Sequence, residues 1–171
     1  MNFLEKDLEK IIFETPNEHL RSGEFWVNGI KKRQLRIGNY GVADLVTCHR
    51  NYDLEFMEGL EKPIKHPYAE ITVYELKQKE VNIKTLIQGA RYCAGIRNYL
   101  DKRKLSFIYK INLVLIGNSF NVDSDILYLE QLFENLSIVT YKIIDDVVSF
   151  EYHSGFERGL LSEGFNIKNH K

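Results

Sequence analysis

Apolar positions near the start of the chain recur at the spacing of one helix face. In the segment NFLEKDLEKIIFE these positions are Leu4, Leu8, Ile11 and Ile12, and Pro16 ends the pattern. We therefore predict that this segment is the first helix. A glutamate on its inner edge would face the sheet, and the helical angles place Glu5 nearer to the apolar face than Glu9, at roughly 70° against roughly 110°.

The pattern then changes to the two-residue period of strands. Residues 33–49 predict two short strands that turn at residues 38–41, and residues 69–78 predict a third strand. Between them, residues 50–68 contain one glycine, two prolines and no sustained period. We predict that this insertion is a loop or an excursion from the sheet.

The second half of the chain alternates between the two patterns. Residues 82–104 predict a long helix with Asn82 as its N-cap, and residues 106–120 predict an apolar strand suited to a sheet centre. Residues 123–135 predict an amphipathic helix, and residues 136–154 predict two strands that turn near Asp145 and Asp146. The order of elements indicates an α/β fold with helices on the faces of a mixed sheet.

Composition adds limits to this picture. A chain of 171 residues with 44% hydrophobic residues is long enough for one domain with a core, which we place at residues 1–155 with a tail at 156–171. The net charge of −1 gives no global case for a polyanion partner. The charged N-terminal segment, the lack of a long apolar run and two cysteines without metal-type spacing predict a cytoplasmic protein that does not enter a membrane.

Charged residues interrupt two of the predicted strands. Asp44 shares a strand face with Val42 and Val46, and Glu75 and Lys77 share the apolar face of the next strand. If the strands are neighbours, the two carboxylates converge with the lysine beside them. Burying these charges costs several kcal/mol unless they are paired or hold a metal, and two carboxylates suit Mg²⁺ or Mn²⁺.

The Glu-x-Lys triplet alone is weak evidence, because chance alone produces about one or two such triplets in a chain of this composition. The structural alternative is a partly exposed ion pair at a strand end, with Asp44 in a turn. The helix that follows adds Gln88 and Tyr92, four residues apart and therefore on one face. We expect the neighbouring stripe to pack on the sheet; its residues are Ile83, Ile87, Ala90, Cys93 and Ala94.

Four segments in this order, EKDL, GVAD, YELK and QGARY, resemble the PD-(D/E)xK nuclease superfamily. They are most similar to the RecB-like branch and to the nuclease domain of archaeal-type mismatch and branched-DNA endonucleases. The resemblance covers residues 4–99 and implies a restriction-endonuclease-like αβββαβ core, to which this chain adds a helix and C-terminal strands. The chain departs from the motif at Ala43, where the superfamily's name has a proline.

The resemblance implies a Mg²⁺- or Mn²⁺-dependent DNA nuclease. Asp44, Glu75 and Glu5 would hold the metal, Lys77 would position the attacking water, and Gln88 would orient water or phosphate. Whether Glu5 or Glu9 is the acid of the first helix stays open. Basic and aromatic residues around this site and in the cluster KKRQLR would bind DNA; they are Tyr92, Arg91, Lys84, Lys79, Arg36 and Lys32.

Two other functions fit the same sequence. A module that keeps the nuclease fold without catalysis would bind DNA or protein, and a related nuclease would act on RNA or in a defence system. With no appended DNA-binding domain in the sequence, substrate choice would rest on loops, on a homodimer or on a targeting partner protein. The sequence does not distinguish endonuclease from exonuclease action.

Overall fold

The computed structural model describes residues 4–15, 27–104, 107–121, 126, 129, 133–144 and 147–153. The elements in chain order are α1 (Glu5–Glu14), β1 (Ile30–Arg36), the 3₁₀ helix η1 (Gly38–Tyr40), β2 (Val42–Glu55), β3 (Ile64–Leu76), β4 (Glu80–Val81), α2 (Ile83–Lys102), β5 (Ile108–Gly117), β6 (Ser119–Phe120), β7 (Leu136–Ile144) and β8 (Val147–His153).

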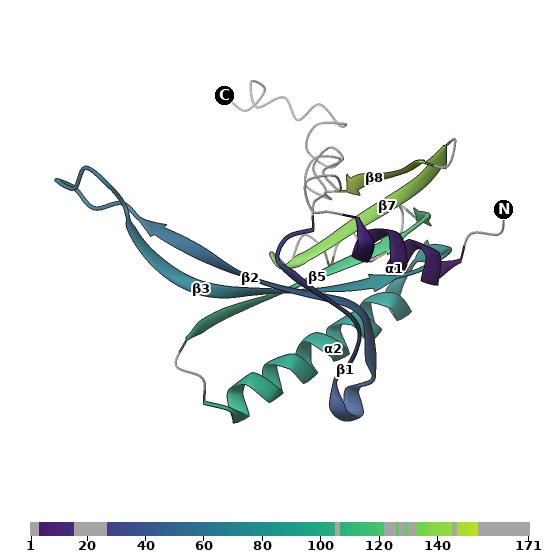
Figure 1. Ribbon diagram of the computed structural model, residues 1–171, viewed down its shortest axis with the longest axis horizontal. Coiled ribbons are helices and arrows are strands. Elements are labelled where there is room, and N and C mark those ends of the chain that lie inside the picture. The colour runs from purple at the N-terminus through teal and green to yellow at the C-terminus, as the bar shows by residue number, and fades with distance from the viewer. Residues whose placement is uncertain are drawn as a thin grey trace, which may run out of the picture.

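The main sheet has six strands in the order β1-β2-β3-β5-β7-β8. Strands β1, β2 and β3 are antiparallel neighbours, β3, β5 and β7 run parallel, and β8 returns antiparallel to β7. Helices α1 and α2 lie on opposite faces of this sheet (Figure 1). The predicted α/β class with a mixed sheet between helices is confirmed, and β5 lies inside the sheet as its apolar sequence indicated.

Some of the other predicted elements are present, and some lie outside the described residues. The first helix, the turn at residues 38–41 and the β7–β8 pair are present where the sequence placed them. The helix predicted at residues 123–135 lies mostly outside the described residues, as do Pro16, Asp145, Asp146 and the tail at 156–171. Among the helices that the structure describes, none combines the length and the apolar character needed to cross a membrane.

Helix α2 begins where predicted, because the Asn82 side chain accepts hydrogen bonds from the backbone N–H groups of Lys84 and Thr85 at 3.0 and 3.3 Å. The predicted packing stripe was wrong except at Cys93, which is partly buried and packs against the core. Ile83 and Ile87 are 46% and 62% exposed, and Ala90 and Ala94 are also exposed. The buried residues of α2 are Thr85, Leu86, Gly89, Tyr92, Gly95 and Ile96.

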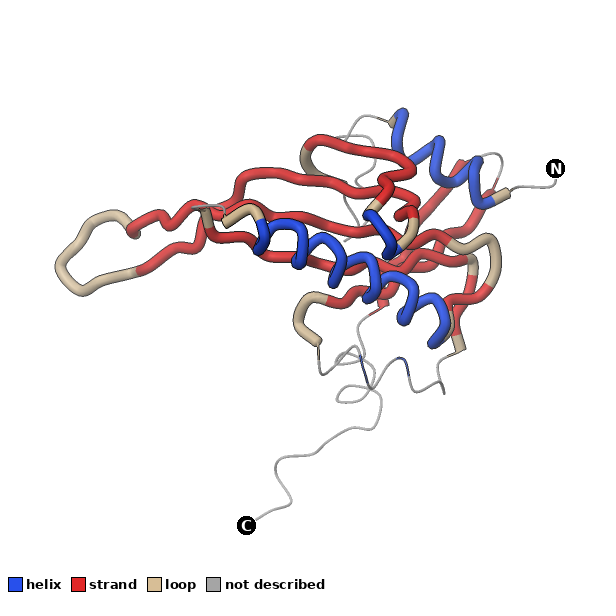
Figure 2. The backbone as a smooth tube through the Cα atoms, turned by 90° about the horizontal axis from the view of Figure 1, so that it is seen from below, coloured by secondary structure: helices blue, strands red, loops and turns tan. Residues whose placement is uncertain are grey.

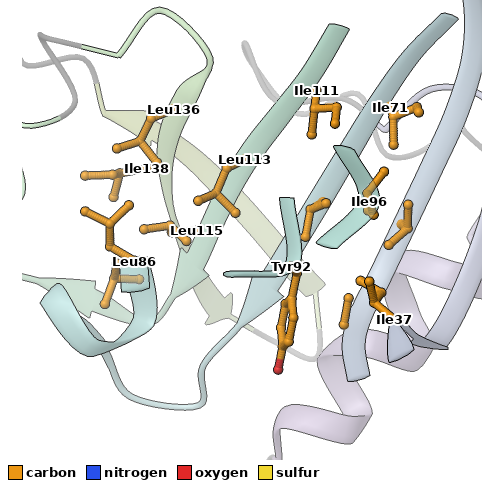
Figure 3. Packing of buried hydrophobic residues seen from close by; sticks show 14 of the residues in the cluster. Ile37, Ile71, Leu86, Tyr92, Ile96, Ile111, Leu113, Leu115, Leu136 and Ile138 are labelled. Atoms are coloured by element: carbon orange, nitrogen blue, oxygen red, sulfur yellow. The ribbon is translucent and has the colours of Figure 1, made fainter. Parts of the chain in front are cut away.

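Two glycines explain this orientation. A Cβ atom at Gly89 would lie 2.5 Å from the Leu113 side chain, and one at Gly95 would lie 2.6 Å from Ile37 and from the Tyr40 ring. The helix therefore approaches the sheet along its glycines, which a hydrophobicity pattern does not register. Figure 3 shows Leu86, Tyr92 and Ile96 of α2 within the resulting core.

Residues 50–68 form a β-hairpin. Strand β2 continues to Glu55 and β3 begins at Ile64, and the two pair from Leu45–Tyr74 out to Glu55–Ile64. The prediction of a loop was therefore wrong for most of this segment, and only residues 56–63 connect the strands. The excursion from the sheet is an extended two-stranded ribbon that projects beyond the rest of the molecule (Figures 1 and 2).

Candidate functional site

The sheet divides at the end of the β2–β3 ladder. The last backbone pair between these strands is Leu45 with Tyr74. Beyond it β2 stays paired with β1, while β3 stays paired with β5. The Asp44 side chain bridges the division, because its Oδ2 accepts the backbone N–H of Leu76 at 2.9 Å. This hydrogen bond holds Asp44 at the point where β2 and β3 separate, beside the last residue of β3.

The strand around Asp44 is distorted. Ala43 and Val46 both belong to the core under α2, although Leu45 between them belongs to the core under α1. On β1 the ladder omits Gln34, whose φ is +48°. The prediction of one regular face through residues 42–46 therefore does not hold. The side chain of Asp44 reaches β3 from an irregular segment that the two-residue period does not describe.

Glu75 is the most buried acid of the site, with 0% of its surface exposed. It pairs in register with Leu115, a core residue under α2, as expected for its face. Its Oε1 accepts the Lys77 Nζ at 2.6 Å, whereas its Oε2 is buried and has no hydrogen-bond partner. A buried carboxylate oxygen without a partner carries a desolvation cost of about 1–3 kcal/mol or more.

Burial and mutual repulsion change the protonation of this group. Burial raises the pKa of Asp44 to about 6, against the hydrogen bond from Leu76 and the charge of Lys77. Burial, together with the charge of Asp44, raises the pKa of Glu75 to about 7. Burial lowers the pKa of Lys77, but its hydrogen bond to Glu75 and the surrounding carboxylates outweigh burial and raise it. The acids are therefore near their titration point at neutral pH, while the lysine is charged.

The two glutamates of α1 have different positions. The Glu5 carboxylate lies 3.9 Å from the Lys77 Nζ and remains partly exposed. Glu9 is 5% exposed, and its two oxygens accept the Arg33 Nε and the Gln34 Nε2, each at 2.6 Å. Glu5 is thus the helix acid with a direct contact to the site, whereas Glu9 joins α1 to β1.

These positions predict different effects of mutation. Glu9→Ala should lower the free energy of unfolding by roughly 2–4 kcal/mol, because it leaves a partly buried guanidinium without its partner. Glu5→Ala, the matched control on the preceding turn, should change it by less than about 1 kcal/mol, as expected for a long, partly exposed ion pair. Urea unfolding at pH 7 measures both. Equal losses in the two variants would contradict the separate roles.

Gln88 and Tyr92 contact each other on α2, where the Gln88 Nε2 donates to the Tyr92 hydroxyl at 2.9 Å. Tyr92 is buried at 3% exposure and packs against Gly41, just before β2. Gly41 has φ +117°, and a Cβ there would lie 2.9 Å from the Tyr92 ring. Tyr92 thus contacts the residue before β2 and Gln88 contacts Tyr92, and no hydrogen bond among the described residues joins either of them to Asp44 or Glu75.

The predicted DNA-binding residues fall into two groups. Arg91, Lys84 and Lys79 are exposed on the first half of α2 and on the segment after β3, and the Arg91 guanidinium lies 5.7 Å from the Tyr92 ring centre. Lys32 and Arg36 are on β1 and line a separate groove beside the second half of α2. The structure therefore does not bring these two to the carboxylates.

Sequence reasoning missed three residues near the site. Arg33 and Gln34 hold Glu9, and the Tyr141 hydroxyl of β7 donates to the Gln78 carbonyl oxygen at 3.0 Å, directly after Lys77. Burial and the charge of Glu5 raise the pKa of Tyr141. These residues come from strands at distant positions in the chain, and no spacing in the sequence marks them.

The donor chemistry of the site can be compared with the needs of a divalent metal. In the part of the chain that the structure describes, no three His, Cys, Asp or Glu side chains are grouped to hold a metal ion. Asp44 and Glu75 supply two carboxylates, one with a buried oxygen that lacks a partner. Mg²⁺ commonly takes one or two carboxylates and completes its shell with water. The site therefore fits Mg²⁺ or Mn²⁺ through these two acids.

Comparisons of the chain with protein-family models, with curated proteins and with solved structures found no match.

Proposed function

We propose that this protein is a Mg²⁺- or Mn²⁺-dependent nuclease that hydrolyses DNA phosphodiester bonds at the division between β2 and β3. The observation that carries the proposal is the convergence there of Asp44, Glu75 and Lys77, with one Glu75 oxygen buried and unpaired. The order α1, β1, β2, β3, α2 and β5, with the two-residue β4 between β3 and α2, supports the proposal of a restriction-endonuclease-like core. The four sequence segments that resemble the superfamily lie on these elements.

Each residue has a defined task in this proposal. Asp44 and Glu75 would hold the metal, which supplies positive charge to the phosphate and acidifies a bound water. The Leu76 N–H fixes one Asp44 oxygen, which would leave the other oxygen for the metal. The two acids are partly protonated at neutral pH, so metal binding would release protons and strengthen between about pH 6 and 8.

Lys77 would act through its charge. Because its pKa is raised, Nζ holds its proton at neutral pH and is a poor general base. An ammonium at this position would orient water and stabilise negative charge that builds up on a phosphate oxygen. The Glu5 carboxylate of α1, 3.9 Å from the Lys77 Nζ, would attract the lysine side chain toward α1. Gln88 and Tyr92 would stabilise the start of β2 that carries Asp44.

A cleavage assay tests this function. Purified protein should cut labelled DNA in the presence of 5–10 mM Mg²⁺ or Mn²⁺, and excess EDTA should stop the reaction. The substrates should include single-stranded, duplex and branched DNA, with a matched RNA set. Cleavage of RNA alone would favour the related RNA nuclease. Metal-independent binding of DNA with no cleavage of any substrate would favour the non-catalytic module.

A further inference from the structure

A groove lies beside the second half of α2, on the face of the sheet that this helix covers. It has a volume of about 830 Å³ and lies between α2 and β1. Its lining extends from Arg36 and Tyr40 at one end to Ile30 and Cys48 at the other, and the last two pair in register. Figure 2 shows α2 across the sheet, with the strands β1 and β2 beside it.

The same face continues from the groove onto the projecting hairpin. Val46 and Cys48 of β2 line the groove. Because side chains at every second residue of a strand share a face, Arg50 and Tyr52 lie on the groove side of the hairpin. The Arg50 guanidinium is 5.3 Å from the centre of the Tyr52 ring, and the Lys65 Nζ is 5.7 Å from it. The groove and this part of the hairpin therefore form one surface.

The charged residues of this surface are basic. Every charged side chain that lines the groove is a lysine or an arginine, and the Arg103 guanidinium lies 5.0 Å from the ring centre of Tyr99, which also lines it. In the part of the chain that the structure describes, none of these cations is in an ion pair with an acid. We call them, with the two cations of the hairpin, the basic surface: Lys32, Arg36, Arg50, Lys65, Lys102 and Arg103.

The acids nearest in sequence lie elsewhere. Asp53 and Glu55, at odd positions of β2, are on the opposite face of the hairpin, where each pairs with a lysine or a histidine at 2.7 Å. Asp101 of α2 accepts a hydrogen bond from the Tyr109 hydroxyl of β5. Two further acids are in the connection at the tip, Glu58 and Glu61. The basic surface therefore ends before the tip of the hairpin.

Exposed aromatic rings accompany the cations. Tyr99 is 56% exposed at the groove and Tyr52 is 41% exposed on the hairpin, while Tyr40 is held at the other end of the groove by a hydrogen bond of 2.9 Å from the Asn98 Nδ2. Cations interleaved with aromatic rings suit single-stranded nucleic acid, because the cations contact phosphates and unpaired bases stack on the rings. In a duplex the base faces are already stacked on each other and are not free for such contacts.

We propose that the basic surface and the groove bind a single-stranded segment of DNA, with its bases toward the groove and its phosphates along the cations. The inference rests on the proposed function, since this strand would be part of the nuclease substrate. Arg36 pairs in register with Val42, two residues before Asp44, so a strand in the groove has one end on the side of the carboxylates. The substrate class is therefore DNA with an unpaired segment rather than fully paired duplex.

Binding without metal tests the surface separately from cleavage. In EDTA, fluorescence anisotropy should show that the protein binds a labelled oligothymidylate of about 20 nucleotides more tightly than a blunt duplex of the same length. Tyr99→Ala and Tyr52→Ala should each raise the dissociation constant about 5-fold or more, as for the loss of one stacked base. Tyr68→Ala is the matched control, since the Lys110 Nζ lies 4.3 Å from that ring centre on the opposite face, and it should change the constant by less than about 2-fold.

Salt dependence tests the role of the cations. For a single strand, the logarithm of the binding constant falls with the logarithm of the salt concentration, with a slope of about −0.7 for each phosphate that is neutralised. Lys32→Gln combined with Lys102→Gln should therefore make the slope less steep by about 1.4. Lys10→Gln combined with Lys142→Gln, at exposed positions of α1 and β7, should leave it unchanged. The same slope in both double variants would overturn the assignment of phosphates to this surface.

The outcomes separate this inference from the proposed function. DNA cleavage together with unchanged strand binding in Tyr99→Ala and Tyr52→Ala would overturn the inference and leave the nuclease standing. Absence of cleavage, with binding that still depends on both tyrosines, would support the surface and count against the nuclease. Tighter binding of the duplex, or of a matched RNA strand, would overturn the choice of single-stranded DNA. Circular dichroism should show that both variants fold like the wild type, since both rings are exposed.

Discussion

Lys77→Ala is expected to slow DNA cleavage by about 10²–10⁴-fold while leaving the fold intact. The side chain is partly exposed, so its removal leaves no large cavity. It does remove the charge nearest to the Glu75 carboxylate, at 2.6 Å. Single-turnover rates with enzyme in excess measure the chemical step, and they separate it from any change in DNA affinity.

Asp44→Ala and Glu75→Ala should cause losses at least as large, because each removes a proposed metal ligand. Lys142→Ala is the matched control, since Lys142 is also paired with a glutamate, at 3.3 Å from Glu151, but lies on the exposed surface of β7. Its cleavage rate should stay within a factor of about two of the wild type. A Lys77→Ala rate as high as that of this control would rule out the proposed role.

Asp44→Asn is expected to stabilise the protein at pH 8 in the absence of metal, by about 1–3 kcal/mol. Folding raises the pKa of Asp44 from 3.8 to about 6 and that of Glu75 from 4.5 to about 7. The folded state therefore binds more protons between about pH 4 and 7, and its free energy of unfolding falls as the pH rises through that window. The amide removes one buried charge and the repulsion on Glu75, and it retains an oxygen for the Leu76 N–H.

Urea unfolding at pH 4, 6 and 8 measures this effect. The difference from the wild type should be small at pH 4, where Asp44 is protonated in the folded state, and fully developed at pH 8. Glu151→Gln, an exposed carboxyl-to-amide change on β8, should show no such trend. An Asp44→Asn variant that is less stable than the wild type at pH 8 would contradict the claim that the buried charge of Asp44 destabilises the folded state.

Metal binding offers a further check on the same variant. A ligand that binds only the folded state raises the unfolding free energy by RT ln(1 + [L]/Kd). We expect 10 mM Mg²⁺ to raise the unfolding temperature of the wild type at pH 8 and to leave that of Asp44→Asn nearly unchanged. Equal stabilisation of both proteins would place metal binding away from Asp44.

The local sequence determined most of the secondary structure and the central pair of the site. Apolar spacing marked α1, Asn82 marked the start of α2, and the apolar run of β5 marked the sheet interior. These signals are local, since a helix period, a cap and a buried strand each depend on residues close together in the chain. The convergence of Asp44 and Glu75 followed as soon as β2 and β3 were treated as neighbours.

Only the tertiary structure decided which helix faces are buried and which residues surround the site. The glycines of α2 determine its orientation through their close approach to Leu113 and Tyr40, and Arg33 with Gln34 determines that Glu9 is buried. For residues 50–68 the prolines and the glycine left a loop and an excursion from the sheet both open, and the pairing of β2 with β3 decided for an extended two-stranded ribbon. In each case the deciding contact joins residues far apart in the chain, and the sequence pattern of either partner alone does not contain it.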